Sequence, residues 1–205
     1  MRAGVGRTGI VTLGAGAALL ALLVGTWAAT RGGALAGCRG GRVAGDLGGP
    51  FTLVDARGRE VTDADVITAP AILTFGYTFC PDVCPLNAAR DAEAVRLLEE
   101  RGILATPVWI SFDPARDTPE VVGLFAGNFH ERMVGLTGSQ AQVDAAADAY
   151  RVYRARGEGE GEFYLMDHSS LSYLVLPGAG VVGVVGREAA PAEVADRFEC
   201  LVRAA

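Results

Sequence analysis

Two cysteines follow an apolar run in the middle of the chain, and this junction limits the possible folds more than any other feature. Residues 71–77 form a continuous apolar segment without helical periodicity, which is typical of a strand buried on both faces. Cys80 and Cys84 come next, each followed by proline, and an amphipathic pattern then runs to Gly102 at a helix C-cap position. The pattern predicts a buried strand that turns into a helix, with both sulfurs at the corner.

Strand and helix signals alternate along the rest of the chain. Strands or hairpins are expected over residues 51–61, 104–112, 133–136, 163–166, 171–176 and 181–185. Helices are expected over residues 119–129, 139–150 and 191–202, and residues 156–162 are expected to form a charged loop. This order predicts an α/β domain with a central sheet covered by helices on both faces.

The N-terminal segment has the length and composition of a membrane anchor. Residues 9–29 contain no charge, and about 20 apolar residues span a bilayer core. Arg2 and Arg7 precede this segment, so the positive-inside tendency places the N-terminus in the cytoplasm and the remainder of the chain outside it. A cleaved signal peptide is the alternative interpretation of the same pattern.

Three regions are therefore expected. Residues 1–30 form a cytoplasmic stub and membrane anchor, residues 31–48 a flexible Gly-rich tether, and residues 49–205 the folded domain. The tether includes Leu35-Ala36-Gly37-Cys38, which resembles a bacterial lipoprotein processing box, although an arginine and two glycines separate it from the apolar segment. Either form of attachment leaves the domain tethered to a membrane and facing away from the cytoplasm.

The exported part is strongly acidic. After residue 38, all 24 acidic residues stand against 15 of the 18 arginines, which gives a formal charge of −9. Nucleic-acid binding selects for basic faces, so this balance argues against it.

The spacing of Cys80 and Cys84 suits chemistry better than a structural staple. Two residues four apart in a first helical turn have Cβ atoms about 5–6 Å apart, close enough to chelate one ion or to close a disulfide. A helix N-terminus also lowers the pKa of a thiol and populates the thiolate. An inert disulfide is the alternative, but it would close a very short loop and so contribute little stability.

A metal would need further ligands, and the chain has two histidines. His168 lies in a polar break between two strand signals, from which a loop could bring the imidazole over the cysteines. A structural role is commoner for a lone histidine, and His130 is expected to be a solvated residue at a helix C-terminus. Two thiolates and an imidazole suit copper, while zinc stays chemically possible.

The remaining cysteines have no close partner in the sequence. Cys200 is expected to be a small buried apolar residue of the last helix, and a bridge to Cys38 on the tether is the alternative.

Three motifs, in order and spacing, resemble the Sco/SenC family: Phe75-Gly76-Tyr77-Thr78-Phe79-Cys80-Pro81-Asp82-Val83-Cys84-Pro85, then Ser111-Phe112-Asp113-Pro114-Ala115-Arg116-Asp117-Thr118-Pro119-Glu120, then Asp167-His168-Ser169-Ser170. The similarity extends from about residue 49 to 202. It implies a thioredoxin-like fold and a copper site made by Cys80, Cys84 and His168. Asp113 would be an acidic residue near that site, supporting its ligands, or else only a turn former.

The resemblance also implies a role and a place. The expected function is assembly of the binuclear copper site of cytochrome c oxidase subunit II, by delivering copper as Cu(I) or Cu(II), at the bacterial inner membrane with the domain in the periplasm. A thiol:disulfide reductase acting on cysteines of an oxidase subunit is the alternative, with Cys80 and Cys84 as its redox pair. A redox or copper sensor is a third possibility. The acidic, Gly-rich residues 156–162 leave the choice of partner open.

Overall fold

The computed structural model describes Cys38 and residues 46–205. The expected anchor at residues 9–29 and most of the tether lie outside this range. Within the part that is described, no helix is both long and apolar enough to cross a bilayer.

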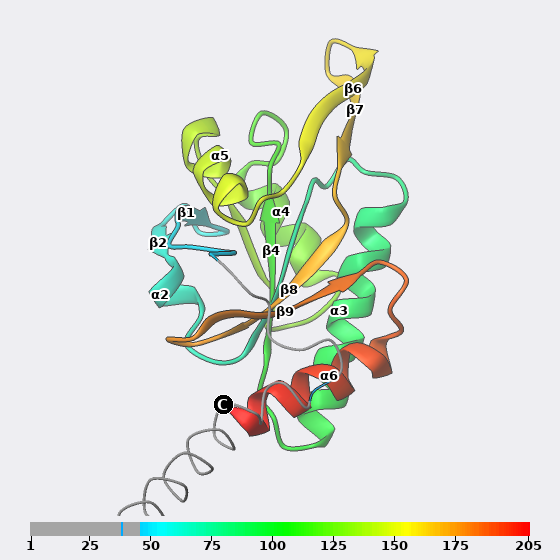
Figure 1. The fold of residues 1–205 in the computed structure, drawn as a ribbon. Helices are drawn as coiled ribbons and strands as arrows, with labels where there is room; N and C mark the ends of the chain where they lie inside the picture. The colour runs from blue at the N-terminus through cyan, green and yellow to red at the C-terminus, as the bar shows by residue number, and fades with distance from the viewer. Residues whose placement is uncertain (1–37, 39–45) are drawn as a thin grey trace, which may run out of the picture.

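A seven-stranded sheet forms the centre of the domain (Figure 1), in the order β2-β1-β5-β4-β3-β8-β9. The strands are β1 (Thr52–Asp55), β2 (Glu60–Thr62), β3 (Ala71–Gly76), β4 (Thr106–Ser111), β5 (Val134–Thr137), β8 (Leu171–Leu176) and β9 (Gly180–Gly186). β3, β4 and β5 are parallel, and antiparallel strands flank them on both sides. Every residue of β3 is buried, as predicted for a strand covered on both faces.

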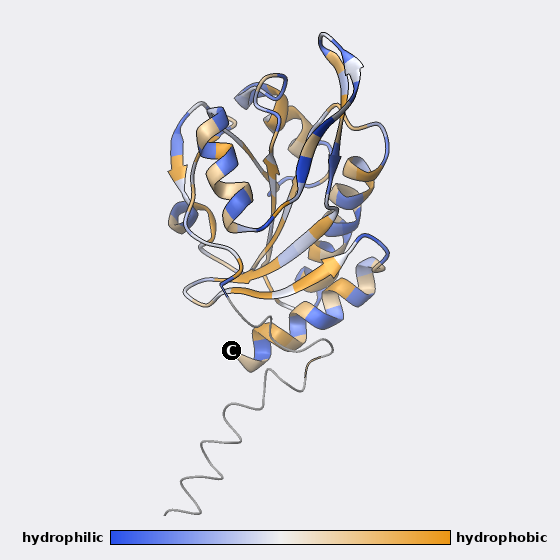
Figure 2. Cartoon of the chain, turned by 45° about the horizontal axis from the view of Figure 1, so that its top comes forward, coloured by the Kyte–Doolittle hydropathy of each residue, from blue (hydrophilic) through white to orange (hydrophobic). Residues whose placement is uncertain are grey.

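Helices cover both faces of this sheet, which confirms the predicted α/β architecture. α3 (Val83–Glu100), α4 (Pro119–Gly127) and α6 (Pro191–Ala204) pack on one face, α5 (Gln140–Ala149) packs on the other, and α2 (Asp63–Val66) is a short helix after β2. Alternation along β3 divides the side chains: Thr74 hydrogen-bonds Asp91 of α3, while the Phe75 ring lies 5.4 Å from the Tyr150 ring after α5. Figure 2 shows the resulting hydrophobic strands and two-sided helices.

A buried polar cluster fixes α3 against the sheet. The Asp91 carboxylate accepts hydrogen bonds from Thr74 of β3 and Ser172 of β8, at 2.6 and 2.7 Å. The Arg90 guanidinium pairs with the same carboxylate at 2.8 Å and also donates to the carbonyl of Gly186. Buried charges are tolerated when paired and hydrogen-bonded in this way, so the middle of α3 has a defined position relative to β3 and β8.

The expected loop at residues 156–162 is instead part of a second sheet. β6 (Arg154–Glu160) and β7 (Phe163–His168) pair as an antiparallel hairpin that projects from the domain (Figure 1). The loop prediction was wrong because charge and glycine content, which lower strand propensity, are outweighed here by pairing with β7. Gly159 and Gly161 have φ values of +129° and +58°, which lets the hairpin bulge and turn.

A disulfide joins Cys38 to Cys200, across 162 positions of sequence, with a Cα–Cα distance of 5.8 Å. The expectation that Cys200 is simply an apolar core residue is therefore wrong, and the bridge considered as the alternative is present. The reason lies in tertiary structure, because Cys38 is buried in the core between the sheet, α3 and α6. The sulfur that lipidation would modify is the one in the bridge, so the disulfide is incompatible with a lipidated Cys38.

Candidate metal centre

The two remaining cysteines lie at the junction between β3 and α3, as predicted. β3 ends at Gly76, a short loop follows, and α3 begins at Val83. Cys84 is in the first turn of α3 and is 1% exposed, whereas Cys80 precedes the helix and is 8% exposed. The expectation that both cysteines share a first helical turn is wrong, because the loop positions Cys80 through a bond from its N–H to the Tyr77 carbonyl at 3.3 Å. Both thiols are free.

His168 follows Cys84 by 84 positions in the sequence but lies beside both cysteines in the structure. It is the last residue of β7, and its Nε2 lies 3.6 Å from Sγ of Cys84. The donor atoms of Cys80, Cys84 and His168 all lie within 4.8 Å of one another. The ring is oriented by its Nδ1, which donates to the Ser169 carbonyl at 3.0 Å and leaves Nε2 facing the sulfurs.

The charges at this cluster are unevenly shared. A hydrogen bond from Cys84 lowers the pKa of Cys80 to about 3, with further help from His168 and from backbone N–H groups at the start of α3. The pKa of Cys84 is raised, because it donates to Cys80 and is buried, so the expected acidification by the helix N-terminus does not hold for this residue. Burial is the largest single influence on His168 and would lower its pKa, but the hydrogen bonds to Cys80 and to the Ser169 carbonyl, with the negative charges of Cys80 and Asp167, together raise that pKa.

Asp117 supports the cysteine loop, a role that its position in the sequence did not predict. Its carboxylate accepts hydrogen bonds from the backbone N–H and the hydroxyl of Thr78, at 2.9 and 2.5 Å, and from the Ser111 hydroxyl at 2.5 Å. Burial raises the pKa of Asp117, and these hydrogen bonds oppose the shift. The sequence signal was its place in the second motif, two residues before the proline that starts α4.

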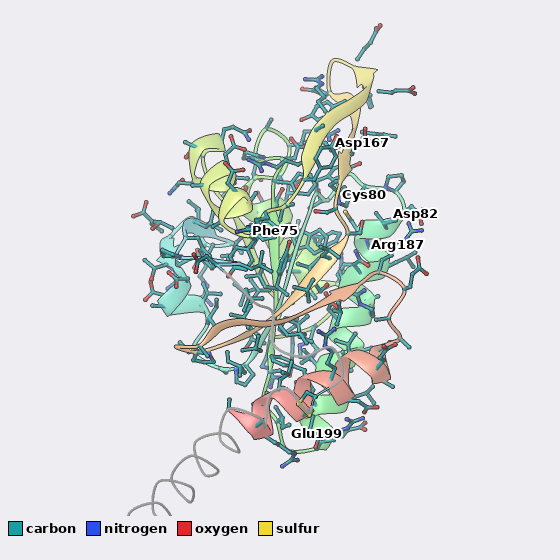
Figure 3. All side chains as sticks on the ribbon, viewed as in Figure 1. Phe75, Cys80, Asp82, Asp167, Arg187 and Glu199 are labelled. Atoms are coloured by element: carbon teal, nitrogen blue, oxygen red, sulfur yellow. A yellow bond between two sulfur atoms is a disulfide. The ribbon has the colours of Figure 1, made fainter. Side chains whose placement is uncertain are left out.

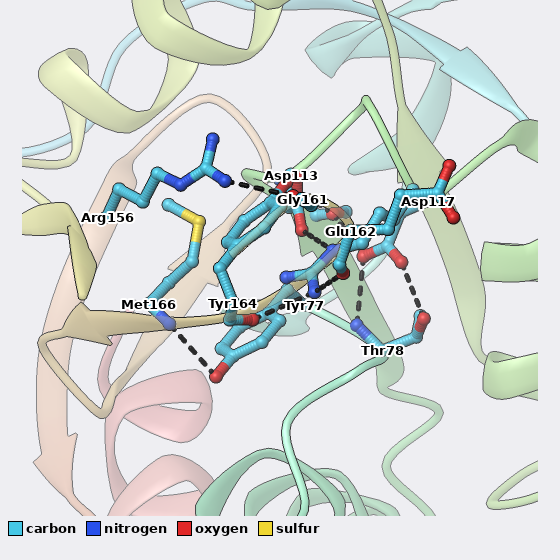
Figure 4. A network of polar contacts seen from close by, with 11 residues as sticks. Tyr77, Thr78, Asp113, Asp117, Arg156, Gly161, Glu162, Tyr164 and Met166 are labelled. Atoms are coloured by element: carbon cyan, nitrogen blue, oxygen red, sulfur yellow. Dashed lines mark hydrogen bonds and ion pairs between the residues drawn. The ribbon is translucent and has the colours of Figure 1, made fainter. Parts of the chain in front are cut away.

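Asp113 contacts residues that position His168, one of the three candidate ligands. Its carboxylate accepts a hydrogen bond from the Tyr164 hydroxyl at 2.6 Å and pairs with Nε of Arg116 at 2.6 Å (Figure 4). The Arg116 guanidinium also donates to the carbonyls of Glu162 and Tyr164. Asp113 and Arg116 therefore hold β7, which ends in His168, against the loop after β4.

His130 takes no part in this cluster. The expectation of a solvated residue is wrong, because His130 is 7% exposed and its Nδ1 accepts a hydrogen bond from the N–H of Arg132 at 3.1 Å. Its Nε2 lies 3.4 Å from the carboxylate of Glu99, near the C-terminal end of α3. Burial lowers the pKa of His130, so the ring is neutral and structural.

The chain is similar in sequence and fold to known proteins. The family model described as SCO1/SenC matches residues 40–203. Protein SenC of Rhodobacter capsulatus is 48% identical over 158 residues, which cover 77% of this chain and 72% of that protein. The mitochondrial SCO1 homolog of Homo sapiens is 38% identical over 152 residues, covering 73% of this chain and 50% of that protein.

Solved structures agree with this similarity. The crystal structure of Arabidopsis thaliana ScoI with copper bound has a TM-score of 0.73 and 36% identity, covering 77% of this chain and 99% of that one. Bradyrhizobium japonicum ScoI with copper bound gives a TM-score of 0.67 and 33% identity, covering 75% and 98%. The chain therefore has the thioredoxin-like fold of these structures, and it belongs to the SCO1/SenC family.

Proposed function

We propose that Cys80, Cys84 and His168 hold a copper ion as cargo, which the protein delivers to the binuclear copper site of cytochrome c oxidase subunit II. The observation that carries this proposal is the approach of the three donor atoms to within 4.8 Å of one another. Two sulfurs and an imidazole suit Cu(I), and the imidazole also allows Cu(II). The copper-bound ScoI structures of two relatives above 30% identity support the choice of ion.

The position of the cluster suits release as well as binding. Cys80 lies at the edge of the core, at the end of the domain opposite the C-terminal part of α6 (Figure 3). His168 is partly exposed, at the base of a projecting hairpin. A ligand-exchange transfer needs incoming donors to reach the ion, and only Cys84 is fully enclosed.

The place of action follows from the expected anchor. We expect the protein in the bacterial inner membrane, with the domain in the periplasm. The Cys38–Cys200 disulfide supports an oxidising compartment, where such bonds persist. Mass spectrometry of the mature N-terminus tests the anchor: a chain that begins after residue 29 would show a cleaved signal peptide.

Copper titration of the purified full chain tests the ligand set. Single changes of Cys80 or Cys84 to Ser, and of His168 to Ala, are expected to abolish stable Cu(II) binding. Each should also weaken Cu(I) binding at least about 100-fold, which corresponds to about 2.8 kcal/mol. His130→Gln, which removes the other histidine, should leave the affinity unchanged. Full affinity in His168→Ala would contradict the three-ligand assignment.

A thiol:disulfide reductase is the second candidate, because two free sulfurs lie side by side with one near the surface and the other buried. Cys80 would attack a partner disulfide, and Cys84 would resolve the mixed disulfide, leaving two partner thiols and a Cys80–Cys84 disulfide. Reduction of oxidised subunit II by His168→Ala separates the two functions. A reductase keeps much of its activity in this variant, whereas copper delivery is lost.

A further inference from the structure

Large apolar side chains lie exposed beside the metal centre. Phe79, the residue before Cys80, is 49% exposed, and Phe163 at the start of β7 is 76% exposed. Their ring centroids lie 6.3 Å apart, so the loop and the hairpin tip form one continuous surface. Leu165 is 48% exposed and shares the outward side of β7 with Phe163. We call Phe79, Phe163 and Leu165 the aromatic ridge.

A buried ion pair contacts the Phe79 ring of the aromatic ridge. The Arg116 guanidinium lies 4.6 Å over the Phe79 ring and 3.6 Å over the Tyr164 ring, and Asp113 neutralises it at 2.6 Å. The Phe79 ring therefore rests against a buried ion pair, and the Phe163 ring in turn packs against Phe79. Aromatic side chains with little freedom left to lose make good contacts at protein interfaces.

Carboxylates border the aromatic ridge on the hairpin. Glu158, Glu160 and Glu162 are all exposed, and we call them the acidic rim. The nearest arginines are already engaged: Arg116 pairs with Asp113, and Arg156 lies 4.0 Å over the Tyr164 ring and donates to the Gly161 carbonyl. The hairpin tip therefore presents a net negative charge next to apolar surface, because three glutamates stand against the single positive charge of Arg156.

We propose that the aromatic ridge and the acidic rim together dock the protein that receives copper, and that this partner carries an apolar patch bordered by lysine or arginine. The inference rests on the proposed function. Ligand exchange requires the partner's donor atoms to reach the ion at Cys80, and a partner that does so must cover the neighbouring Phe79. The three glutamates select a basic border and accelerate the encounter by electrostatic steering. They would be repelled by an anionic membrane surface.

Binding kinetics with the copper-free soluble domain of subunit II from the same organism test the proposal, with the full chain in detergent. The variant Glu158→Gln/Glu160→Gln/Glu162→Gln should lower the association rate about tenfold at low salt and flatten its salt dependence. The matched variant Glu131→Gln/Glu188→Gln/Glu193→Gln removes the same charge from exposed positions elsewhere and should change the rate less than about twofold.

The aromatic ridge is tested separately. Phe163→Ala should weaken binding about tenfold, mainly through faster dissociation, because a buried interface aromatic is commonly an anchor. Leu124→Ala, a similarly exposed apolar residue of α4 at 67% exposure, should leave binding unchanged. Copper affinity should stay at the wild-type value in all four variants.

Unchanged association rates and affinities in the acidic-rim and Phe163→Ala variants would overturn the proposal, and so would failure of the wild-type chain to bind this domain. If Phe163→Ala instead loses attachment to phosphatidylserine vesicles while binding the domain normally, the aromatic ridge is a membrane contact and the proposal is wrong. If the wild-type chain does not bind copper in the titration, the proposed function is refuted by a separate measurement.

Discussion

Removing the Cys38–Cys200 disulfide tests how the N-terminal tether contributes to the stability of the domain. The perturbation is the double variant Cys38→Ser/Cys200→Ser. The bridge closes a loop of 162 residues, one of the longest that this chain allows. In the chain-entropy model, a loop of that length removes about 17 cal/mol/K from the unfolded ensemble, or about 5 kcal/mol at 25 °C. We therefore expect the double variant to lose about 5 kcal/mol of unfolding free energy.

Urea denaturation of a chain that begins at residue 34 measures this loss, with fluorescence of the buried Trp109 as the signal. A loss of about 5 kcal/mol should lower Tm by roughly 10–20 °C in a domain of this size. The double variant should also unfold with a larger m-value, because its unfolded state is less compact. Cys80→Ala/Cys84→Ala is the control, since it removes two cysteines that form no bond and should cost less than about 2 kcal/mol.

Two results would refute this reasoning. The first is a loss of less than about 1 kcal/mol in the double variant, which would mean that the bridge does not constrain the unfolded chain. The second is a count of four reactive thiols in denatured wild-type protein, where the structure requires only Cys80 and Cys84 to react.

Three further outcomes follow from particular contacts. Asp117→Ala leaves the N–H and the hydroxyl of Thr78, in the loop before Cys80, without their acceptor. Cu(I) binding, measured by chelator competition, should weaken about tenfold in this variant, whereas Asp117→Asn should retain part of the affinity. Gly76→Ala should destabilise the domain by about 1–3 kcal/mol in urea and disturb copper binding, because the new Cβ would overlap the Trp109 ring and lie 3.0 Å from Sγ of Cys84. His130 has a lowered pKa in the folded state, so its contribution to stability is present above about pH 6.5 and is lost as the pH falls from there through the folded pKa; His130→Gln should flatten this part of the stability profile, and an unchanged slope would contradict it.

The local elements of the fold could be predicted from the sequence, because their causes are local. The apolar run before Cys80 can only be satisfied by burial on both faces, and the proline after Thr118 fixes the start of α4. The candidate ligands could also be named, since only two histidines and one closely spaced cysteine pair were available. Ligand chemistry depends on residue type, which the sequence states directly.

Pairings between distant segments were decided by tertiary structure. Local patterns favoured a loop at residues 156–162 and an apolar role for Cys200, but strand pairing and a bridge to Cys38 outweighed them. The local pattern predicted a solvated helix end for His130, whereas in the structure the ring contacts Glu99 and Arg132 and is buried. The Cys38–Cys200 bridge spans 162 positions and Glu99 reaches His130 from another element, so no local propensity encodes either contact, whereas β6 pairs with β7, the next strand of the chain.

The candidate metal centre shows the same division. The sequence by itself determined that two sulfurs would stand at the corner between β3 and α3. Tertiary structure decided that His168, 84 positions after Cys84, would bring its Nε2 to 3.6 Å from that sulfur. It also decided that Asp117 would hold the loop and that Cys80 rather than Cys84 would carry the negative charge. The physical reason is that distances, burial and hydrogen bonds between segments set the geometry and ionisation of a site, whereas the sequence sets only which groups are available.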